Sequence, residues 1–332
     1  MRGCRAVTPA YASLDALWTA WLTGATGVKE TLADWQDLTS RVVHGLAPAD
    51  GFVLATTKGD MALEEQWIRG ERLSPPPVLS SAARRVADAA GLCGPSYCVS
   101  TACSSGLAAI IEAAILVKSA QMRCVTVCGA DIASRFVQDG FAALKAISPT
   151  VCRPFDLRRD GLTLGSAAAA CTVDAESTGI MLSGYAMAND AVHMTAPDRQ
   201  GRGLMRAITG ALEMANLGPS DIDVILPHGT GTRYNDAMEA IAMGTLFPHA
   251  PAITAIKGLI GHTLGAAGLI DTCVGVRMLE EQMVPPVIGL EQSEFGQLNL
   301  VTGLPRKMHI RHVLKTASGF GGVNAAIVLS RS

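Results

Sequence analysis

One cysteine has a sequence context that could make it a nucleophile. Cys103 lies in Ser100–Gly106 (STACSSG), a run of small residues between a short apolar stretch and a helical pattern that continues to Lys118. At a helix N-terminus, free backbone N–H groups and the helix dipole stabilise a thiolate, and the same N–H groups can stabilise an oxyanion on a bound thioester. The pattern therefore predicts that Cys103 is a nucleophile. A buried, inert thiol is expected instead for Cys4, Cys93, Cys124, Cys128, Cys171 and Cys273.

Two histidines lie in glycine-rich segments. His228 stands in the segment PHGTGT, whose glycines let the backbone approach a ligand and whose Thr230 and Thr232 offer hydroxyls on one side. Its imidazole can donate an N–H to a carbonyl or an enolate. His262 stands in the segment KGLIGHTLGAAG, at the start of a second helix of small residues. An isolated histidine at a strand end is more often structural, but the glycine–threonine frame favours a catalytic interpretation for His228.

Three further residues accompany these segments. Lys257 enters the turn of His262, and Asp271 falls on the helix that follows. A buried lysine is unfavourable unless it is paired, which predicts a Lys257–Asp271 ion pair; the alternative is a solvated lysine and an aspartate near a helix start. Near the end of the chain, the segment SGFGGVN could point the backbone N–H of Phe320 into a site that its ring gates, or could be a simple glycine-rich turn.

A thiolate, two imidazoles and a glycine-rich N–H donor together indicate acyl transfer. Their spacing alone does not separate a thioesterase from a condensing enzyme. No metal site is predicted. The chain has one set of cysteines spaced by five residues and one pair spaced by four, but neither comes with a second Cys/His pair at zinc-finger spacing. These cysteines are Cys93, Cys98 and Cys103, and Cys124 and Cys128.

The composition restricts the class of protein. A net charge of −2 over 332 residues argues against nucleic-acid binding. The longest uncharged apolar stretch, Leu162–Val173, is too short to cross a membrane, and Asp15 interrupts what would be the apolar part of a signal peptide. Nine cysteines without a secretion signal indicate a reducing compartment, so we expect a cytoplasmic protein that binds neither nucleic acid nor membranes.

The elements that must position these residues follow one order twice: strand, glycine-rich turn, helix, strand. The expected strands are Gly51–Thr56, Tyr97–Ser100 and Arg123–Gly129 in the first half and Asp223–Pro227 and a closing strand His312–Ala317 in the second. Parallel strands need crossover helices, so this order predicts an α/β protein with a mostly parallel sheet in each half. We place the halves at residues 1–171, which carry the cysteine, and 172–332, which carry both histidines.

At these residues the chain resembles the β-ketoacyl-acyl-carrier-protein synthases, the ketosynthases that act as condensing enzymes in fatty acid and polyketide assembly. The resemblance runs from about residue 7 to residue 329. Further motifs that match the family are Thr8-Pro9 with Trp18 and Leu22–Gly24, Gly140–Ser148, Arg153–Asp156 with Arg159–Gly161, and Asp190–Pro197. Several specific motifs in the family's order make a chance match untenable.

The resemblance implies a thiolase-like fold of two pseudo-equivalent βαβ-type halves in an αβαβα arrangement. It also implies a homodimer, or a heterodimer with a second ketosynthase-like subunit. Cys103 would take an acyl chain from an acyl carrier protein or a coenzyme A thioester, with the backbone N–H groups of Cys103 and Phe320 as the oxyanion hole. A malonyl thioester would then enter along a pantetheine tunnel, in which Thr230 and Thr232 bind the arm.

In the implied mechanism, His228 and His262 promote decarboxylation and stabilise the enolate that attacks the acyl-cysteine. Lys257 and Asp271 would position His262 or a water. Loss of carbon dioxide drives this decarboxylative Claisen condensation, so no cofactor and no metal are expected.

The chain departs from the family in two places. It is shorter, mostly between Thr31 and Tyr97, a stretch that usually covers the acyl pocket and part of the dimer surface. It also has Gly165-Ser166-Ala167 where the family has Gly-Glu-Gly.

Three alternatives stay open beside condensation. One is a chain-length-factor-like partner subunit, although such a subunit is expected to lose the cysteine and the histidines. Another is an acyltransferase that passes the chain from Cys103 to an amine or a hydroxyl. A thiolase is disfavoured, because it needs a second catalytic cysteine near the C-terminus and the last cysteine, Cys273, lies in a helical pattern.

Overall fold

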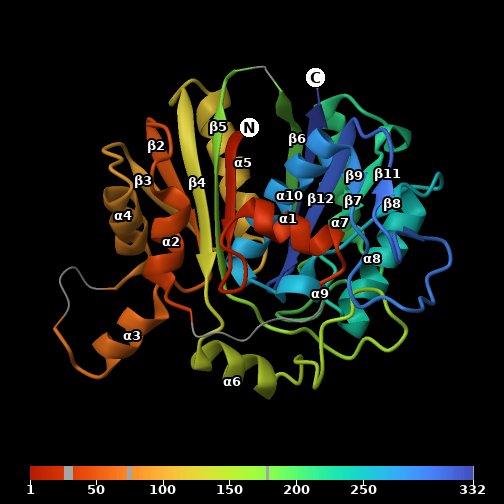
Figure 1. Ribbon diagram of the computed structural model, residues 1–332, viewed down its shortest axis with the longest axis horizontal. Helices are drawn as coiled ribbons and strands as arrows, with labels where there is room; N and C mark the ends of the chain where they lie inside the picture. Colours follow the sequence, from red (N-terminus) through yellow and green to blue (C-terminus); the bar gives the residue numbers. More distant parts are fainter. Residues whose placement is uncertain (26–32, 73–76, 177–178, 332) are drawn as a thin grey trace.

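The computed structural model describes residues 1–25, 33–72, 77–176 and 179–331. Within these residues two sheets form the centre of the molecule (Figure 1). The first sheet has the order β1 (Arg2–Val7), β5 (Ala167–Asp174), β4 (Cys124–Asp131), β2 (Gly51–Ala55) and β3 (Ser96–Val99). The second has the order β10 (Asn299–Leu300), β8 (Ala252–Ile253), β7 (Val224–Leu226), β12 (His312–Gly319), β13 (Val323–Arg331) and β6 (Ile180–Asn189). A small ribbon pairs β11 (Arg306–Lys307) with β9 (Met283–Val284).

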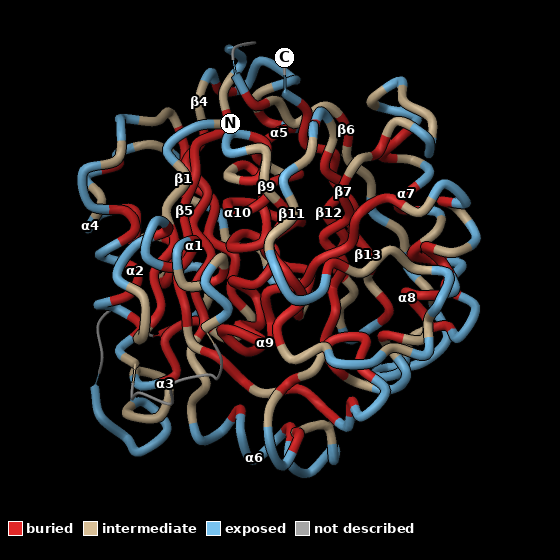
Figure 2. The backbone as a smooth tube through the Cα atoms, turned by 45° about the vertical axis from the view of Figure 1, so that its right-hand side comes forward, coloured by how far each residue is buried: buried red, intermediate tan, exposed pale blue. Residues whose placement is uncertain are grey.

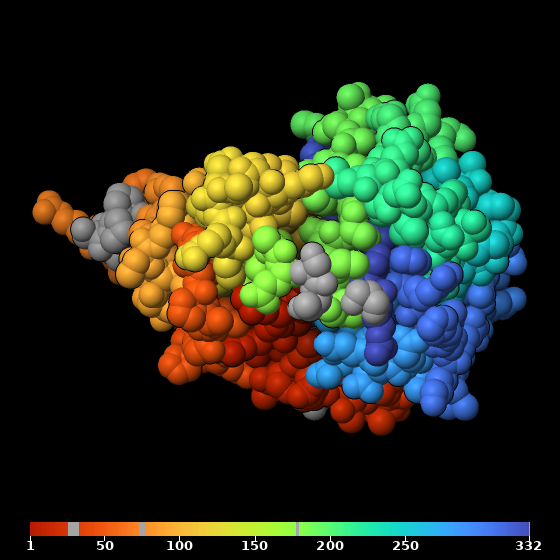
Figure 3. Space-filling view, turned by 90° about the horizontal axis from the view of Figure 1, so that it is seen from above, coloured from red at the N-terminus to blue at the C-terminus, as the bar shows by residue number. Residues whose placement is uncertain are grey.

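Helices complete five layers. The helices α5 (Ser105–Lys118) and α10 (Ala267–Glu281) lie between the sheets and contact strands of both. The first sheet is covered outside by α2 (Trp35–Val43) and α4 (Leu79–Ala89), and the second by α7 (Arg202–Ala215), on which α8 (Arg233–Leu246) packs. The two halves lie side by side (Figure 3). The predicted αβαβα arrangement is therefore confirmed.

The remaining helices lie around this sandwich. They are α1 (Leu14–Leu22), α3 (Met61–Ile68), α6 (Arg135–Ala143), α9 (Lys257–Ile260), and the 3-10 turns η1 (Pro219–Asp221) and η2 (Leu264–Ala266). None of the helices in the described residues is both long and apolar enough to span a membrane.

The two central helices are buried along most of their length, as the tube in Figure 2 shows. Their sequences are apolar or small on every face, as expected for helices packed between two sheets. They cross closely at Gly106, where an added Cβ would lie 2.6 Å from the backbone nitrogen of Leu269. A glycine is therefore required at this position, one turn beyond the candidate nucleophile.

Two expectations about the strands were wrong. Half of the pairings in the first sheet are antiparallel, since β5 runs against both β1 and β4. The strand at His312 does not close the sheet, because β13 follows and pairs antiparallel with both β12 and β6. Both of these strands, β5 and β13, are almost fully buried, so they lack the alternating pattern that identifies a half-buried strand.

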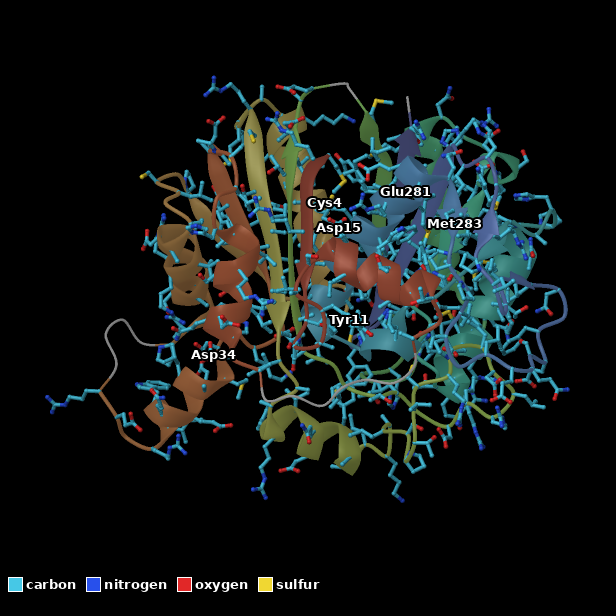
Figure 4. The ribbon with its side chains drawn as sticks, viewed as in Figure 1. Cys4, Tyr11, Asp15, Asp34, Glu281 and Met283 are labelled. Atoms are coloured by element: carbon cyan, nitrogen blue, oxygen red, sulfur yellow. The ribbon has the colours of Figure 1, made fainter. Side chains whose placement is uncertain are left out.

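The N-terminal segment joins the two halves. Figure 4 labels Cys4 on β1 and Asp15 on α1, both beside α10. Asp15 forms an ion pair with Arg277 of α10, and the indole nitrogen of Trp21 donates to the carbonyl of Pro286 at 2.8 Å. The predicted division after residue 171 falls inside β5, which ends at Asp174, whereas the second sheet begins with β6 at Ile180. The division into two halves remains a prediction.

Candidate active site

The Cys103 turn is fixed by its own backbone and hydroxyls. The backbone N–H of Thr101 donates to the Ser105 hydroxyl at 2.9 Å, and that hydroxyl donates to the carbonyl of Ala102 at 2.6 Å. Ala102 has a φ of 52°, a left-handed conformation that costs a non-glycine residue about 1 kcal/mol or more. This bend leads directly into α5 and places Cys103, which is only 6% exposed, at the start of that helix.

The His228 loop is held by two buried carboxylates. It follows β7 and precedes α8, which carries Asp236 and Glu239 on its inner side. Glu239 accepts the N–H groups of His228 at 2.6 Å and Gly229 at 2.7 Å, and Asp236 accepts that of Thr230 at 3.1 Å. Sequence analysis missed both carboxylates. Two acids three residues apart, shortly after the PHGTGT segment, were the available signal.

The His262 loop is clamped by a strand-like segment of the first half. Its N–H donates to the carbonyl of Thr163 at 2.6 Å, and its carbonyl accepts the N–H of Gly165 at 3.0 Å. A Cβ at Gly165 would meet the carbonyl oxygen of Ile260 at 2.0 Å, so this glycine is required for the close approach. The neighbouring Ser166 accepts the N–H of Ala133 at 2.9 Å, which joins the start of β5 to the segment after β4.

These three residues, which come from distant parts of the chain, meet in one buried cluster. The sulfur of Cys103 and the ligand nitrogens of His228 and His262 all lie within 4.8 Å of one another. The two imidazole rings lie 5.1 Å apart between centroids and are nearly perpendicular, at 84°. Nδ1 of His262 is buried and, among the described residues, has no hydrogen-bond partner, so it can serve a substrate atom. The spacing of this cluster would also suit a metal ion.

Burial and nearby ammonium groups set the protonation of the cluster. Desolvation, followed by the positive charge of Lys257, holds the pKa of both His228 and His262 well below the ordinary value of 6.5. Burial raises the pKa of the Cys103 thiol to about 11, and Lys257 and the backbone N–H of Phe320 oppose this only in part. Desolvation thus opposes the expected stabilisation of a thiolate by the helix start, which stays a prediction.

The predicted Lys257–Asp271 ion pair is confirmed. The ammonium of Lys257 lies 3.5 Å from the carboxylate of Asp271, both are buried, and the same ammonium donates to the carbonyl of His228. A second lysine lies nearer still. Nζ of Lys315 on β12 lies 2.5 Å from the same carboxylate oxygen. Sequence analysis did not single out Lys315, although a lysine inside the apolar strand HVLKTA was a signal.

Phe320 lies at the mouth of the site. Its backbone N–H lies close enough to the sulfur of Cys103 to lower the pKa of that thiol, and its role in an oxyanion hole stays a prediction. Its ring is 37% exposed and stacks on Phe141 of α6, with the two centroids 5.7 Å apart. Phe141 is thus a further candidate residue, which the sequence analysis quoted only within a family motif.

A cavity of about 380 Å³ leads to the cluster and is lined by Cys103, His228, His262, Thr230, Thr232 and Phe320 among others. The hydroxyls of Thr230 and Thr232 lie 2.9 Å apart within it and share a hydrogen bond. A larger hollow of about 860 Å³ lies between the start of the chain and α6, but Cys103 does not line it. Because a reaction needs access to the nucleophile, we assign the chemistry to the smaller cavity.

Comparisons with known proteins show the family of this chain. The family described as "Beta-ketoacyl synthase, N-terminal domain" matches residues 49–178, and "Beta-ketoacyl synthase, C-terminal domain" matches residues 180–291. The 3-oxoacyl-[acyl-carrier-protein] synthase 2 of Coxiella burnetii is 33% identical over 326 residues, which cover 90% of this chain and 79% of that protein. Putative polyketide beta-ketoacyl synthase 1 of Streptomyces halstedii is 37% identical, over 76% of this chain and 64% of that protein.

Solved structures share the fold. The ketosynthase ApeO in complex with its chain length factor ApeC, from Xenorhabdus doucetiae, matches with a TM-score of 0.85 and 25% identity, over 99% of this chain and 96% of that chain. The structure entitled "AntDE:AntF (apo): type II PKS acyl-carrier protein in complex with its ketosynthase bound to the hexaketide" matches with a TM-score of 0.88 and 22% identity, over 99% and 98% of the two chains.

Proposed function

The chain belongs to the β-ketoacyl synthase family of condensing acyltransferases, and from that premise we propose that Cys103, His228 and His262 carry out a decarboxylative Claisen condensation. The observation that carries the proposal is the cluster itself. A thiol and two neutral imidazoles lie within 4.8 Å of one another at the end of a cavity that an acyl thioester can enter. This arrangement supplies a nucleophile, a base and two hydrogen-bond donors or acceptors in one place.

The first step is transfer of the acyl chain to Cys103. Since the thiol has a raised pKa, one of the neutral imidazoles accepts its proton as the sulfur attacks the thioester carbonyl. The backbone N–H groups of Cys103 and Phe320 stabilise the oxyanion of the tetrahedral intermediate. The intermediate then collapses to acyl-Cys103, and the thiol of the carrier leaves with the proton held by the imidazole.

The second step joins the malonyl unit. Its C–CO₂⁻ bond breaks, carbon dioxide leaves, and the electron pair forms an enolate on the thioester oxygen, to which His228 and His262 donate hydrogen bonds. The enolate carbon attacks the carbonyl of acyl-Cys103, and the tetrahedral intermediate expels the sulfur as a thiolate, which takes up a proton from water. A neutral imidazole suits this step because it can donate an N–H without adding a further positive charge beside Lys257.

The remaining residues bind and orient the substrate. The paired hydroxyls of Thr230 and Thr232 offer hydrogen bonds to the amides of a pantetheine arm along the cavity. Lys257 donates to the backbone carbonyl of His228 and is paired with Asp271, so the role of both residues is to position His228 rather than to react. The ring of Phe320, which stacks on Phe141, controls access to the cavity at its mouth.

We propose acyl carrier protein or coenzyme A thioesters as donors and a second ketosynthase-like subunit, identical or not, as partner. The titles of the two similar structures name an acyl-carrier protein and a chain length factor as partners of those ketosynthases. An edge strand of the first sheet, β3, is available for pairing, and its Tyr97 is 40% exposed. Nine free cysteines support a reducing, cytoplasmic location.

The test is intact-protein and peptide mass spectrometry of Cys103 after incubation with a panel of acyl thioesters, with and without malonyl carrier protein. The proposal predicts an acyl adduct on Cys103 that disappears when malonyl carrier protein is added, together with release of carbon dioxide. An adduct that passes to an amine or a hydroxyl without any release of carbon dioxide would instead establish the acyltransferase alternative.

A further inference from the structure

A second buried lysine belongs to the site. Lys315 lies in the middle of β12 with no exposed surface, in a strand that is otherwise apolar toward the molecular centre. Its ammonium lies 2.5 Å from Asp271 and donates to the carbonyl of Pro227 at 3.0 Å. Pro227 directly precedes His228. The ammonium thus joins α10, which follows the His262 loop, to the end of β7, which leads into the His228 loop.

We infer that Lys315 is a positioning residue of this site: it binds Asp271 and the Pro227 carbonyl together, and so fixes the His228 loop and adds a buried positive charge to the site. Burial of a lysine on an apolar strand is costly, and two lysines sharing one carboxylate is a poor arrangement for stability alone. Lys257 by itself already pairs with Asp271. A merely structural strand position would take an apolar residue here, as its neighbours Val313 and Leu314 do.

The charges around the imidazoles come from four elements. Lys257 of α9 and Lys315 of β12 are positive, Asp271 of α10 faces both lysines, and Glu239 of α8 holds the N–H of His228. Asp236, also of α8, lies farther along the loop, and burial raises its pKa to about 7.

Within this set, the positive charges of Lys257 and Lys315 both lower the pKa of His228 and of His262. For Cys103 the strongest charge effects on the pKa come instead from Lys257, Asp131 and Lys58. Burial lowers the pKa of Lys315 itself to about 8, so its ammonium remains charged at neutral and acidic pH. Lys315 therefore favours imidazoles that are neutral, the form that can accept the proton of Cys103 in the proposed function on which this part of the inference rests.

The first test does not depend on activity. The Lys315→Met variant removes the charge and keeps much of the volume. NMR titration of labelled histidines, with His228 and His262 assigned by substitution, should show both titrating about one pH unit higher than in the unaltered protein, as expected for loss of a nearby unit charge at an effective dielectric near 20. Identical titration curves in a folded Lys315→Met protein would overturn the inference.

Leu314→Ala is the matched control. Leu314 is the adjacent buried residue of β12, but it packs with α7 on the opposite face of the sheet. This substitution loosens the same strand without altering a charge, so the protein should melt at a lower temperature while both imidazoles titrate as in the unaltered protein. If the two histidines titrated at a similarly higher pH in both variants, strand packing and not the ammonium would determine their pKa.

The second test measures the rate of Cys103 acylation against pH. In Lys315→Met the acidic limb should move upward by about one unit, which is a roughly tenfold loss of rate on that limb. If the unaltered protein never acylates Cys103, the proposed function fails while the titration still decides the inference. If it does acylate and the two pH profiles coincide, the inference fails and the proposed function stands.

Discussion

The Cys103 turn and the His228 loop bring their residues to the same point by different physical means. The turn is neutral: hydroxyl and backbone contacts bend it, and close helix packing at Gly106 fixes it. The loop is charged: Glu239 holds its N–H groups, and the buried ammoniums of Lys257 and Lys315 hold its carbonyls. We therefore expect shape changes to disturb the turn and charge changes to disturb the loop.

The largest expected effect is a steric one on the Cys103 side. Gly106→Ala puts a Cβ 2.6 Å from the backbone nitrogen of Leu269. The two central helices must then move apart, and we expect the free energy of unfolding to fall by about 3 kcal/mol, the upper part of the range for overpacking. Urea denaturation measures this loss.

Gly140→Ala is its control. Gly140 also lies inside a helix, α6, but nothing lies within 4 Å of the added Cβ. Alanine there should leave stability unchanged or raise it by about 0.5–1 kcal/mol. Equal losses at the two positions would contradict the importance of the close helix crossing.

Next in size is a charge change on the His228 side. Glu239→Gln replaces a carboxylate oxygen by an amide that faces the N–H of His228 or of Gly229, so one donor loses its acceptor. We expect condensation to fall about 100-fold, equivalent to roughly 2–3 kcal/mol, while Cys103 is still acylated. Glu213→Gln, at an exposed position on α7, should change neither rate.

The third prediction concerns pH on the Cys103 side. Only the thiolate reacts with iodoacetamide, and burial raises the pKa of Cys103 to about 11. As pH rises toward that value the thiolate fraction grows, so the alkylation rate of Cys103 should keep rising through pH 9 and 10. Peptide mass spectrometry measures this alkylation rate at each pH. A rate that stops rising below pH 9 would mean that the helix start does stabilise the thiolate.

The smallest effect is expected at the mouth of the site. Phe141→Ala removes the ring stacked on Phe320, a contact of about 0.5–1.5 kcal/mol. We expect kcat/KM for the malonyl thioester to fall about three- to tenfold, as loss of a contact of this size implies. Phe136→Ala removes an exposed ring from the same helix and should have no effect on kinetics.

The sequence predicted the glycine-rich turns of the site better than the buried charges that hold them. Cys103, His228, His262 and the Lys257–Asp271 pair were identified because glycine and small residues mark their turns locally. Glu239 and Lys315 were missed because their partners are backbone groups of the His228 loop, and local signals of an acid on a helix or a lysine in a strand do not show which groups they contact. The raised thiol pKa was missed for a similar reason, since burial depends on the whole fold rather than on the helix start.

The fold showed the same division. The layered arrangement followed from the family resemblance, whereas the buried strands β5 and β13 lack the alternation that identifies a half-buried strand.

The most direct test of the central claim compares Cys103→Ala, His228→Ala and His262→Ala in one assay that records both the acyl adduct and the release of carbon dioxide from a malonyl thioester. Cys103→Ala should form no adduct. Each histidine variant should form the adduct on Cys103 and retain it, while carbon dioxide release falls at least about 100-fold, as for loss of a donor to a developing oxyanion. A histidine variant that consumes its adduct and releases carbon dioxide at the unaltered rate would contradict the account.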